Sequence, residues 1–142
     1  MFKEQKRRES ETALESILPD HFKETPEMTF AGIHLIVDIW GASGLTDMKR
    51  IEDALRGSAK ISDATLIHIH LHRFTPSGGI SGMAILAESH ISIHTWPERE
   101  YAAIDLFMCG DKRPELALPV LKRAFLAKRI EVKTLRRGQI RL

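Results

Sequence analysis

The sequence predicts an α+β fold, a two-layer α/β sandwich in which an antiparallel sheet carries its helices on one face. Two patterns lead to this prediction. Several short segments alternate apolar and polar residues or are rich in β-branched residues, which is typical of strands. Two other segments carry one apolar stripe at helical spacing, so each helix needs a sheet to cover that stripe. Because these helices fall between strands along the chain, two layers are the economical arrangement.

The chain has 142 residues, which suits one domain with an adequate core. Its 21 basic residues nearly balance its 19 acidic residues, so the net charge of +2 gives no reason to expect nucleic acid or an anionic membrane as a partner. The apolar runs are far shorter than the roughly 20 residues of a membrane-spanning helix. The N-terminus is too charged for a signal peptide, and a cytoplasmic location is expected. The single cysteine, Cys109, excludes an intramolecular disulfide.

Residues 1–28 are expected to form an N-terminal extension outside the folded domain, which then comprises residues 29–142. Charged residues dominate this extension. Its apolar residues gather mainly in one cluster before Pro19, long enough for one or two amphipathic helical turns. The low apolar content predicts that the extension is partly disordered. The cluster comprises Ala13, Leu14, Ile17 and Leu18.

The first strand is predicted at 32–40, where β-branched residues predominate. A glycine-containing turn follows at 41–44. Thr46 or Asp47 is expected to cap the first helix, because either side chain can accept a hydrogen bond from the first turn of that helix. Gly57 is expected to end the helix. Its apolar stripe comprises Met48, Ile51 and Leu55.

The second strand is predicted at 64–74 and carries three alternate histidines, which must therefore share one face of the sheet. Three imidazoles can form a zinc site, but no cysteine or carboxylate motif lies nearby, so no metal is expected. The histidines are instead interpreted as part of a polar, partly exposed face. They are His68, His70 and His72.

Three more strands follow in close succession, and a second helix then leads to a last strand. On the third of these strands, Asp105, Phe107 and Cys109 share one face. The second helix contains Pro119, which is expected to shorten or kink its first turns. We predict a turn at 75–79, strands at 80–87, 90–95, 101–109 and 130–135, a loop at 96–100, and a helical apolar stripe at Ala117, Val120, Leu121, Ala124 and Phe125.

Residues 87–109 contain the side chains that could carry chemistry. Glu88-Ser89-His90 is followed by His94 in a His-Thr-Trp-Pro-Glu run and by Cys109 before a glycine. Taken singly, such a serine, histidine or cysteine is usually a turn former, a surface residue or a small apolar filler. A hydrolase triad is disfavoured because no Gly-x-Ser-x-Gly elbow surrounds the serine, and because a second nucleophile, the cysteine, would be redundant in acyl transfer.

In order and spacing, these residues resemble the self-processing segment of the pyruvoyl-dependent S-adenosylmethionine decarboxylases, in their short prokaryotic form. The likeness extends from about Gly32 to about Gly138. The resemblance implies a two-layer α/β sandwich, the same architecture that the patterns predict. It also implies a proenzyme that cleaves itself between Glu88 and Ser89, giving chains of residues 1–88 and 89–142.

The resemblance implies a role for three residues. Ser89 Oγ would attack the Glu88 carbonyl in an N-to-O acyl shift, and β-elimination with loss of ammonia would leave a pyruvoyl group that forms a Schiff base with the substrate and acts as an electron sink. His94 matches the proton acceptor of this processing, and histidine readily exchanges protons near neutral pH. Cys109 matches the proton donor in decarboxylation, since a free thiol is mostly protonated near neutral pH.

Substrate binding is also inferred from the resemblance. Phe74 would stack on the adenine of S-adenosylmethionine, Glu98 would accept hydrogen bonds from the ribose hydroxyls, and Ser81 matches a serine that assists processing. In the prokaryotic family a two-fold homodimer completes the site, so Phe74 and Glu98 are expected to serve the partner's pyruvoyl group.

Two features depart from the family pattern: the run from Phe74 to Ser89 is one residue longer than in the shorter form of the family, and Pro119 lies in a helix that usually lacks it.

The product implied by the resemblance is the aminopropyl donor for spermidine synthesis. Two alternatives stay open. Relatives with the same processing motif decarboxylate arginine or ornithine, and a stacking ring with a carboxylate could also hold a basic side chain. In the other alternative, the chain is an unprocessed paralogue that acts as a non-catalytic or regulatory subunit.

Overall fold

The structure is a computed structural model that describes residues 20–141 of the chain. Its helices and strands are, in chain order, β1 (Lys23–Glu24), β2 (Met28–Phe30), β3 (Gly32–Trp40), α2 (Met48–Ile61), β4 (Leu66–Arg73), β5 (Ile80–Leu86), β6 (Ser89–Trp96), β7 (Tyr101–Cys109), α3 (Ala117–Ala124), β8 (Arg129–Arg137) and β9 (Ile140–Arg141). Short 3-10 helices lie at Pro97–Arg99 and Pro114–Leu116.

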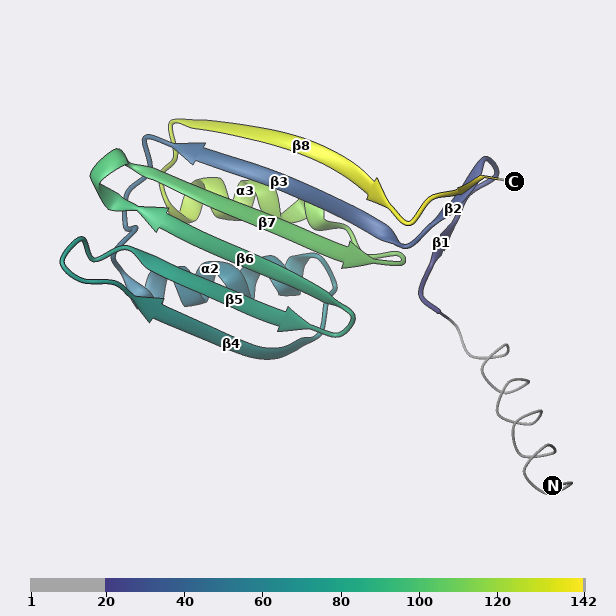
Figure 1. Cartoon of the computed structure of the whole chain (residues 1–142), viewed down its shortest axis with the longest axis horizontal. Helices are drawn as coiled ribbons and strands as arrows, with labels where there is room; N and C mark the ends of the chain where they lie inside the picture. The colour runs from purple at the N-terminus through teal and green to yellow at the C-terminus, as the bar shows by residue number, and fades with distance from the viewer. Residues whose placement is uncertain (1–19, 142) are drawn as a thin grey trace, which may run out of the picture.

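The main sheet has the strand order β4-β5-β6-β7-β3-β8, and every neighbouring pair is antiparallel. Both α2 and α3 cover the same face of this sheet, and its other face is open (Figure 1). The predicted α+β sandwich, with an antiparallel sheet and helices on one face, is therefore confirmed. Each strand predicted from the sequence is present, with bounds that differ by at most two residues.

The core lies between the sheet and the two helices. Along β7, buried residues alternate with half-buried ones, as expected for a strand with one face on the core and one face open. Burying a large aliphatic side chain stabilises the fold by roughly 1.5–3 kcal/mol, so this layer supplies most of the cohesion. The fully buried side chains include Leu35, Ile39, Ile51, Leu55, Ile91, Ile93, Leu106, Met108, Leu121 and Phe125.

The first helix begins as predicted but ends later. Asp47 is its N-cap, because its side chain accepts a hydrogen bond of 3.1 Å from the backbone N–H of Arg50. The prediction that Gly57 ends the helix is wrong, since α2 continues to Ile61. A Cβ at Gly57 would lie 3.5 Å from a methyl group of Val120 on α3. This glycine therefore lies where the two helices meet and does not terminate α2.

Pro119 lies in the first turn of α3, which begins only two residues earlier, at Ala117. Backbone N–H groups in the first turn of a helix have no acceptor within that helix, so a proline is tolerated there. A 3-10 helix at Pro114–Leu116 leads directly into α3. The proline therefore does not interrupt the segment that covers the sheet.

A second, three-stranded sheet has the order β1-β2-β9. It lies beyond one end of the main sheet, at the end where β7 stops (Figure 1). Its first strand belongs to the predicted extension, and β9 comes from the C-terminal tail. Residues 1–19, with the cluster of apolar residues before Pro19, lie outside the described residues, and the boundary at residue 28 stays a prediction.

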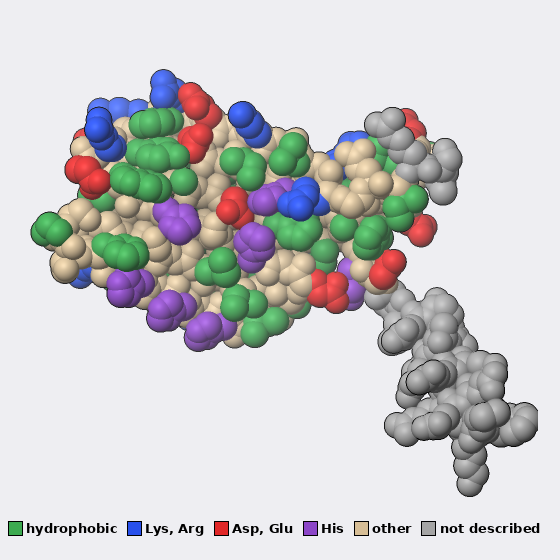
Figure 2. Space-filling view, viewed as in Figure 1, with side chains coloured by type: hydrophobic (Ala, Val, Ile, Leu, Met, Phe, Trp, Pro, Cys, Tyr) green, Lys and Arg blue, Asp and Glu red, His purple; other side chains and the backbone are tan. Residues whose placement is uncertain are grey.

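The open face of the main sheet is rich in histidines and exposed apolar side chains. Directly paired residues of antiparallel strands point to the same side of a sheet, and the pairing places six of the seven histidines on this face. Figure 2 shows this face, with a row of histidines along the β4 edge. These histidines are His34, His68, His70, His72, His90 and His94; the exposed apolar residues among them include Ile36, Met83, Ile85 and Leu135.

Within the described part of the chain, neither helix has the length and apolar character needed to cross a membrane. The cytoplasmic location expected from the sequence stays a prediction.

Candidate active site

Glu88 and Ser89 lie at the tight turn between β5 and β6. Leu86 pairs with Ser89, so Ala87 and Glu88 alone form the turn. The backbone of Glu88 has a φ of +59°, in the left-handed region that non-glycine residues seldom occupy. This conformation costs roughly 1–2 kcal/mol. The peptide bond that the sequence marks for cleavage therefore follows a strained residue at the end of a hairpin.

Cys109 is adjacent to this turn, because β7 ends where β6 begins. The backbone N–H of Cys109 donates a 3.1 Å hydrogen bond to Ser89 Oγ, and its Sγ lies 3.6 Å from the same oxygen. The thiol also lies 3.9 Å from Glu88 Oε2. Ser89 itself is only 9% exposed. The structure thus brings together the predicted cleavage residues and the predicted proton donor in one partly enclosed place, which we call the Ser89 group (Glu88, Ser89 and Cys109).

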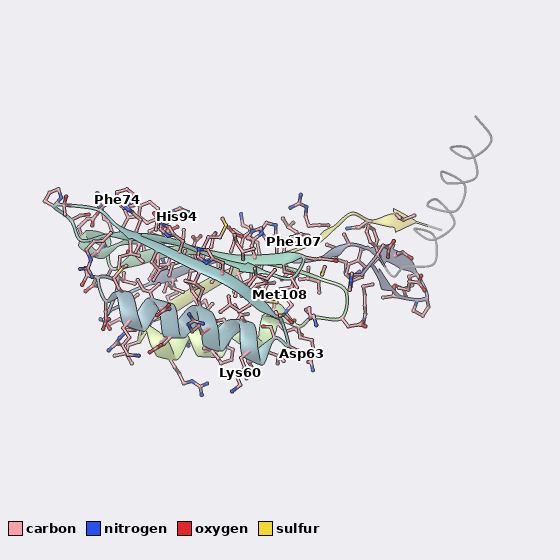
Figure 3. All side chains as sticks on the ribbon, turned by 90° about the horizontal axis from the view of Figure 1, so that it is seen from below. Lys60, Asp63, Phe74, His94, Phe107 and Met108 are labelled. Atoms are coloured by element: carbon pink, nitrogen blue, oxygen red, sulfur yellow. The ribbon has the colours of Figure 1, made fainter. Side chains whose placement is uncertain are left out.

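The predicted proton acceptor lies elsewhere in the same chain. His94 is five residues beyond Ser89 on β6, which corresponds to about 16 Å at about 3.3 Å per residue. Figure 3 shows His94 and Phe74 toward one end of the sheet, and Phe107 and Met108, which precede Cys109, toward the other end. Within a single chain, His94 therefore cannot take a proton from Ser89.

His94 belongs to a second group of predicted residues. Its Nδ1 lies 2.8 Å from Ser81 Oγ on the neighbouring strand. Phe74 is half exposed just beyond β4, with its ring edge-on to His72 at 4.6 Å between centroids. Glu98 is exposed on the 3-10 helix that follows β6. These four residues, Phe74, Ser81, His94 and Glu98, lie at the strand ends opposite to the Ser89 group, and we call them the His94 group.

Three stacked aromatic rings lie at the same end as the His94 group. Tyr101 stacks on Trp40 at 4.3 Å and on Trp96 at 5.3 Å between ring centroids. The hydroxyl group of Tyr101 donates a 2.6 Å hydrogen bond to Asp38. Burial, together with this hydrogen bond and the negative charges of Asp38 and Glu131, raises the pKa of Tyr101 to about 12. The ring system is therefore neutral and fixed in place at physiological pH.

Asp105 organises a network of polar side chains in the middle of the open face, between the two groups. Its carboxylate accepts hydrogen bonds from Ser92 Oγ at 2.5 Å, His90 Nε2 at 2.8 Å and His34 Nε2 at 3.2 Å. Burial acts to raise the pKa of Asp105, but these three hydrogen bonds outweigh it and hold the pKa below its ordinary value. The carboxylate is therefore ionised at neutral pH.

Sequence reasoning missed this network. The signal for it was available: Asp105 shares a face with Cys109 on one strand, and His90 and Ser92 lie on the next strand in antiparallel register. The sequence pattern could not predict that β3, which contributes His34, pairs with β7. No local sequence pattern predicts which strand pairs with the other edge of β7.

Ring nitrogens of His34 and His90 and an oxygen of Asp105 lie within 4.8 Å of one another, as the ligands of a metal ion would. Arg137 opposes this use. Its guanidinium donates to His34 Nδ1 at 3.1 Å, so His34 must carry its proton on Nε2 and donate it to the carboxylate. A hydrogen-bonded network next to a fixed positive charge fits this arrangement better than a metal centre.

A family model described as S-adenosylmethionine decarboxylase matches residues 33–138, most of the chain. The chain belongs to the S-adenosylmethionine decarboxylase family. The match includes both the Ser89 group and the His94 group, and it begins after β1 and β2. The resemblance noted in the sequence is thus confirmed at the level of the family.

Members of this family from several organisms are similar to the chain over most of their length. The S-adenosylmethionine decarboxylase proenzyme of Thermomicrobium roseum is 44% identical over 114 residues, which is 80% of this chain and 98% of that protein. A proenzyme of the same name from Methanococcus maripaludis is 43% identical, over 77% of this chain and 91% of that protein. The crystal structure of the adenosylmethionine decarboxylase from Aquifex aeolicus VF5 superposes with a TM-score of 0.69 at 32% identity, covering 78% of this chain and 93% of that one.

Proposed function

We propose that the chain is a proenzyme that cleaves itself between Glu88 and Ser89 and then decarboxylates S-adenosylmethionine. The observation that carries this proposal is the Ser89 group: a strained scissile residue, a serine hydroxyl held by a backbone N–H, and a thiol 3.6 Å from that hydroxyl oxygen. Family members are named decarboxylase proenzymes. In this proposal the product is the aminopropyl donor for spermidine synthesis.

The geometry of the Ser89 group suits the first step of processing. Ser89 Oγ bonds to the carbonyl carbon of Glu88, the peptide C–N bond breaks, and the hydroxyl proton passes to the released amino group. Removal of the Ser89 Cα proton then expels the Glu88 carboxylate by β-elimination. The dehydroalanine left at position 89 tautomerises to an imine, which takes up water and releases ammonia. The Cys109 N–H holds Oγ beside the scissile bond, which limits the rotamers that the serine can adopt.

The pyruvoyl group that would remain at position 89 supplies a carbonyl that binds the substrate amine and accepts the electrons released with carbon dioxide. The surroundings of Ser89 fit such a group, since the residue is buried to a large extent and has a thiol at its side. In this proposal Cys109 donates the proton to the substrate carbon from which carbon dioxide has left. Phe74 stacks on the adenine and Glu98 accepts from the ribose.

We further propose that a homodimer completes the site. In this dimer, the open faces of the two main sheets would pack against each other. A two-fold axis perpendicular to the strands, lying between the two faces, would place opposite strand ends of the two protomers together. The His94 group of one protomer would then meet the Ser89 group of its partner, which would bring His94 within reach of the serine that it deprotonates. Exposed Ile36, Met83 and Ile85 on this face would be buried in the same contact.

Intact mass spectrometry of the purified protein tests the proposal. We expect fragments of residues 1–88 and 89–142, the second lighter by one ammonia than a fragment with an N-terminal serine. Release of carbon dioxide from carboxyl-labelled S-adenosylmethionine, arginine and ornithine then identifies the substrate. Ser89→Ala should stay uncleaved, whereas Cys109→Ala should be cleaved but lose about a hundred-fold or more in turnover. A wild-type chain that stays intact would overturn the proposal.

A further inference from the structure

A residue outside the family match contacts the cleavage site. His21 lies on the segment that leads into β1, before residue 33, where the family model begins. Its Nε2 is 3.3 Å from Oε1 of Glu88, the residue whose carbonyl the processing attacks. Both side chains are about half exposed, at 52% and 55%. The histidine thus reaches the turn from outside the main sheet.

The segment that carries His21 is anchored two residues after this contact, at Lys23. Lys23 Nζ forms a 2.6 Å ion pair with Asp111 Oδ1, just after the end of β7. Lys23 also pairs with Phe30 in the small sheet, which lies beyond this end of the main sheet (Figure 1). The position of His21 beside Glu88 is therefore restrained, because Lys23 is held by an ion pair and by strand pairing.

Gly110 allows this close approach. It follows Cys109, has a φ of +58°, and a Cβ at this position would lie 2.9 Å from the backbone oxygen of His21. Any other residue would force the segment away from the end of β7. The backbone at His21 therefore packs directly beside the Ser89 group.

We propose that His21 is a positioning residue for self-cleavage. It binds the Glu88 side chain and so restrains the turn in the left-handed conformation, with the Glu88 carbonyl kept within reach of Ser89 Oγ. The bonds made and broken are those of the acyl shift described above, and His21 takes no proton from them. This inference rests on the proposed self-processing and assigns to the extension a role that the family fold alone does not provide.

The rate of cleavage during cell-free synthesis tests the inference. Labelled full-length chain is followed into its two fragments over time for the wild type, His21→Ala and His21→Gln. We expect His21→Ala to be cleaved about ten-fold more slowly, as for the loss of one hydrogen bond to a charged group. His21→Gln, whose amide can still donate to Glu88, should stay within about three-fold of the wild type. Glu27→Ala, an exposed residue of the same segment, is the matched control and should cleave normally.

A double-mutant cycle separates positioning from a general effect on folding. If His21 acts through the Glu88 side chain, His21→Ala should slow Glu88→Ala little further, whereas a general structural effect would add to it. Thermal unfolding of His21→Ala in the uncleavable Ser89→Ala background should match that of Ser89→Ala alone. Cleavage of His21→Ala at the wild-type rate, or additive effects in the cycle, would overturn the inference and leave the proposed function intact. A wild-type chain that is never cleaved would overturn both.

Discussion

At the scale of single residues, the open face depends on Asp105. A carboxylate that is partly buried among histidines is stable only if its lone pairs are used, and three donors use them here. The network fixes the side chains of His90 and Ser92 on the strand that begins with Ser89. The network therefore fixes the side chains in the middle of the open face, between the Ser89 group and the His94 group.

We predict that Asp105→Asn lowers the free energy of unfolding at pH 7 by about 1–2 kcal/mol, because an amide cannot accept from all three donors. Folding lowers the pKa of Asp105, so its stabilisation is complete above the unfolded pKa of about 3.9 and is lost as the pH falls through the folded value. The difference between variant and wild type should therefore shrink below about pH 4.

Urea unfolding at pH 7, 5 and 3, measured in the uncleavable Ser89→Ala background, checks this prediction. Asp63→Asn is the control, since Asp63 is exposed in the turn after α2. An effect of Asp105→Asn that is equal at all three pH values would show that the ionised carboxylate contributes nothing.

At the scale of elements, the Ser89 group depends on how closely β3 approaches the end of β7. Gly32 pairs with Cys109 at the beginning of β3. A Cβ at Gly32 would overlap the carbonyl oxygen of Met108 and lie 2.9 Å from Cys109 Cα. Both obstacles are backbone atoms, which cannot rotate away. The strand that holds Cys109 can therefore approach β3 only because this position lacks a side chain.

We predict that Gly32→Ala destabilises the fold by about 1–3 kcal/mol, as overpacking does, and slows self-cleavage by displacing the Cys109 N–H from Ser89. Gly57→Ala is the matched control in α2. Its Cβ would make only an ordinary contact of 3.5 Å with Val120, and alanine in place of a helical glycine should stabilise the fold by about 0.5–1 kcal/mol. Thermal unfolding and the rate of appearance of the two fragments measure both effects. Equal behaviour of the two variants would contradict the prediction.

At the scale of the whole molecule, the two groups of predicted site residues are separated along the strands. No rotation of side chains can close a gap of about 16 Å, so a working site needs either a second protomer or a different proton acceptor. The proposed dimer joins Ser89 of one chain to His94 of the other. Two defective chains should then be able to complement each other.

We predict that Ser89→Ala and His94→Ala chains, each inactive alone, regain cleavage and decarboxylation when they are produced together. In the mixed dimer, one site combines an intact Ser89 group with an intact His94 group, and the other site has neither. Ser89→Ala and Cys109→Ala provide the control pair for decarboxylation, because both residues belong to the Ser89 group and no site with an intact Ser89 group can form. Cleavage of the Cys109→Ala chain is expected in this pair as well, so only the release of carbon dioxide distinguishes the two pairs.

Mass spectrometry of the mixed preparations and release of labelled carbon dioxide provide the measurements. Cleavage of His94→Ala in the absence of any other chain, or a failure of the first pair to complement, would show that His94 does not act across a dimer.

The sequence by itself determined the layers of this fold. Apolar periodicity indicates which side of a strand or helix is buried, so the strands at 32–40 and 101–109 were predictable from neighbouring residues alone. The helix cap was predicted at Thr46 or Asp47, and the structure places it at Asp47. The spacing of Ser89, His94 and Cys109 also indicated the family. Gly57 was misread, because a glycine that lies at a helix–helix contact resembles one that ends a helix.

Only the tertiary structure decided which of these residues meet. Ser89 and Cys109 are far apart in sequence yet adjacent because two strand ends coincide, whereas Ser89 and His94 are close in sequence and distant because an extended strand carries them apart. His21 contacts Glu88, which is distant in sequence, and the nearby ion pair of Lys23 with Asp111 holds this segment in place. Contacts between elements depend on strand order, register and chain approach, which local periodicity does not encode.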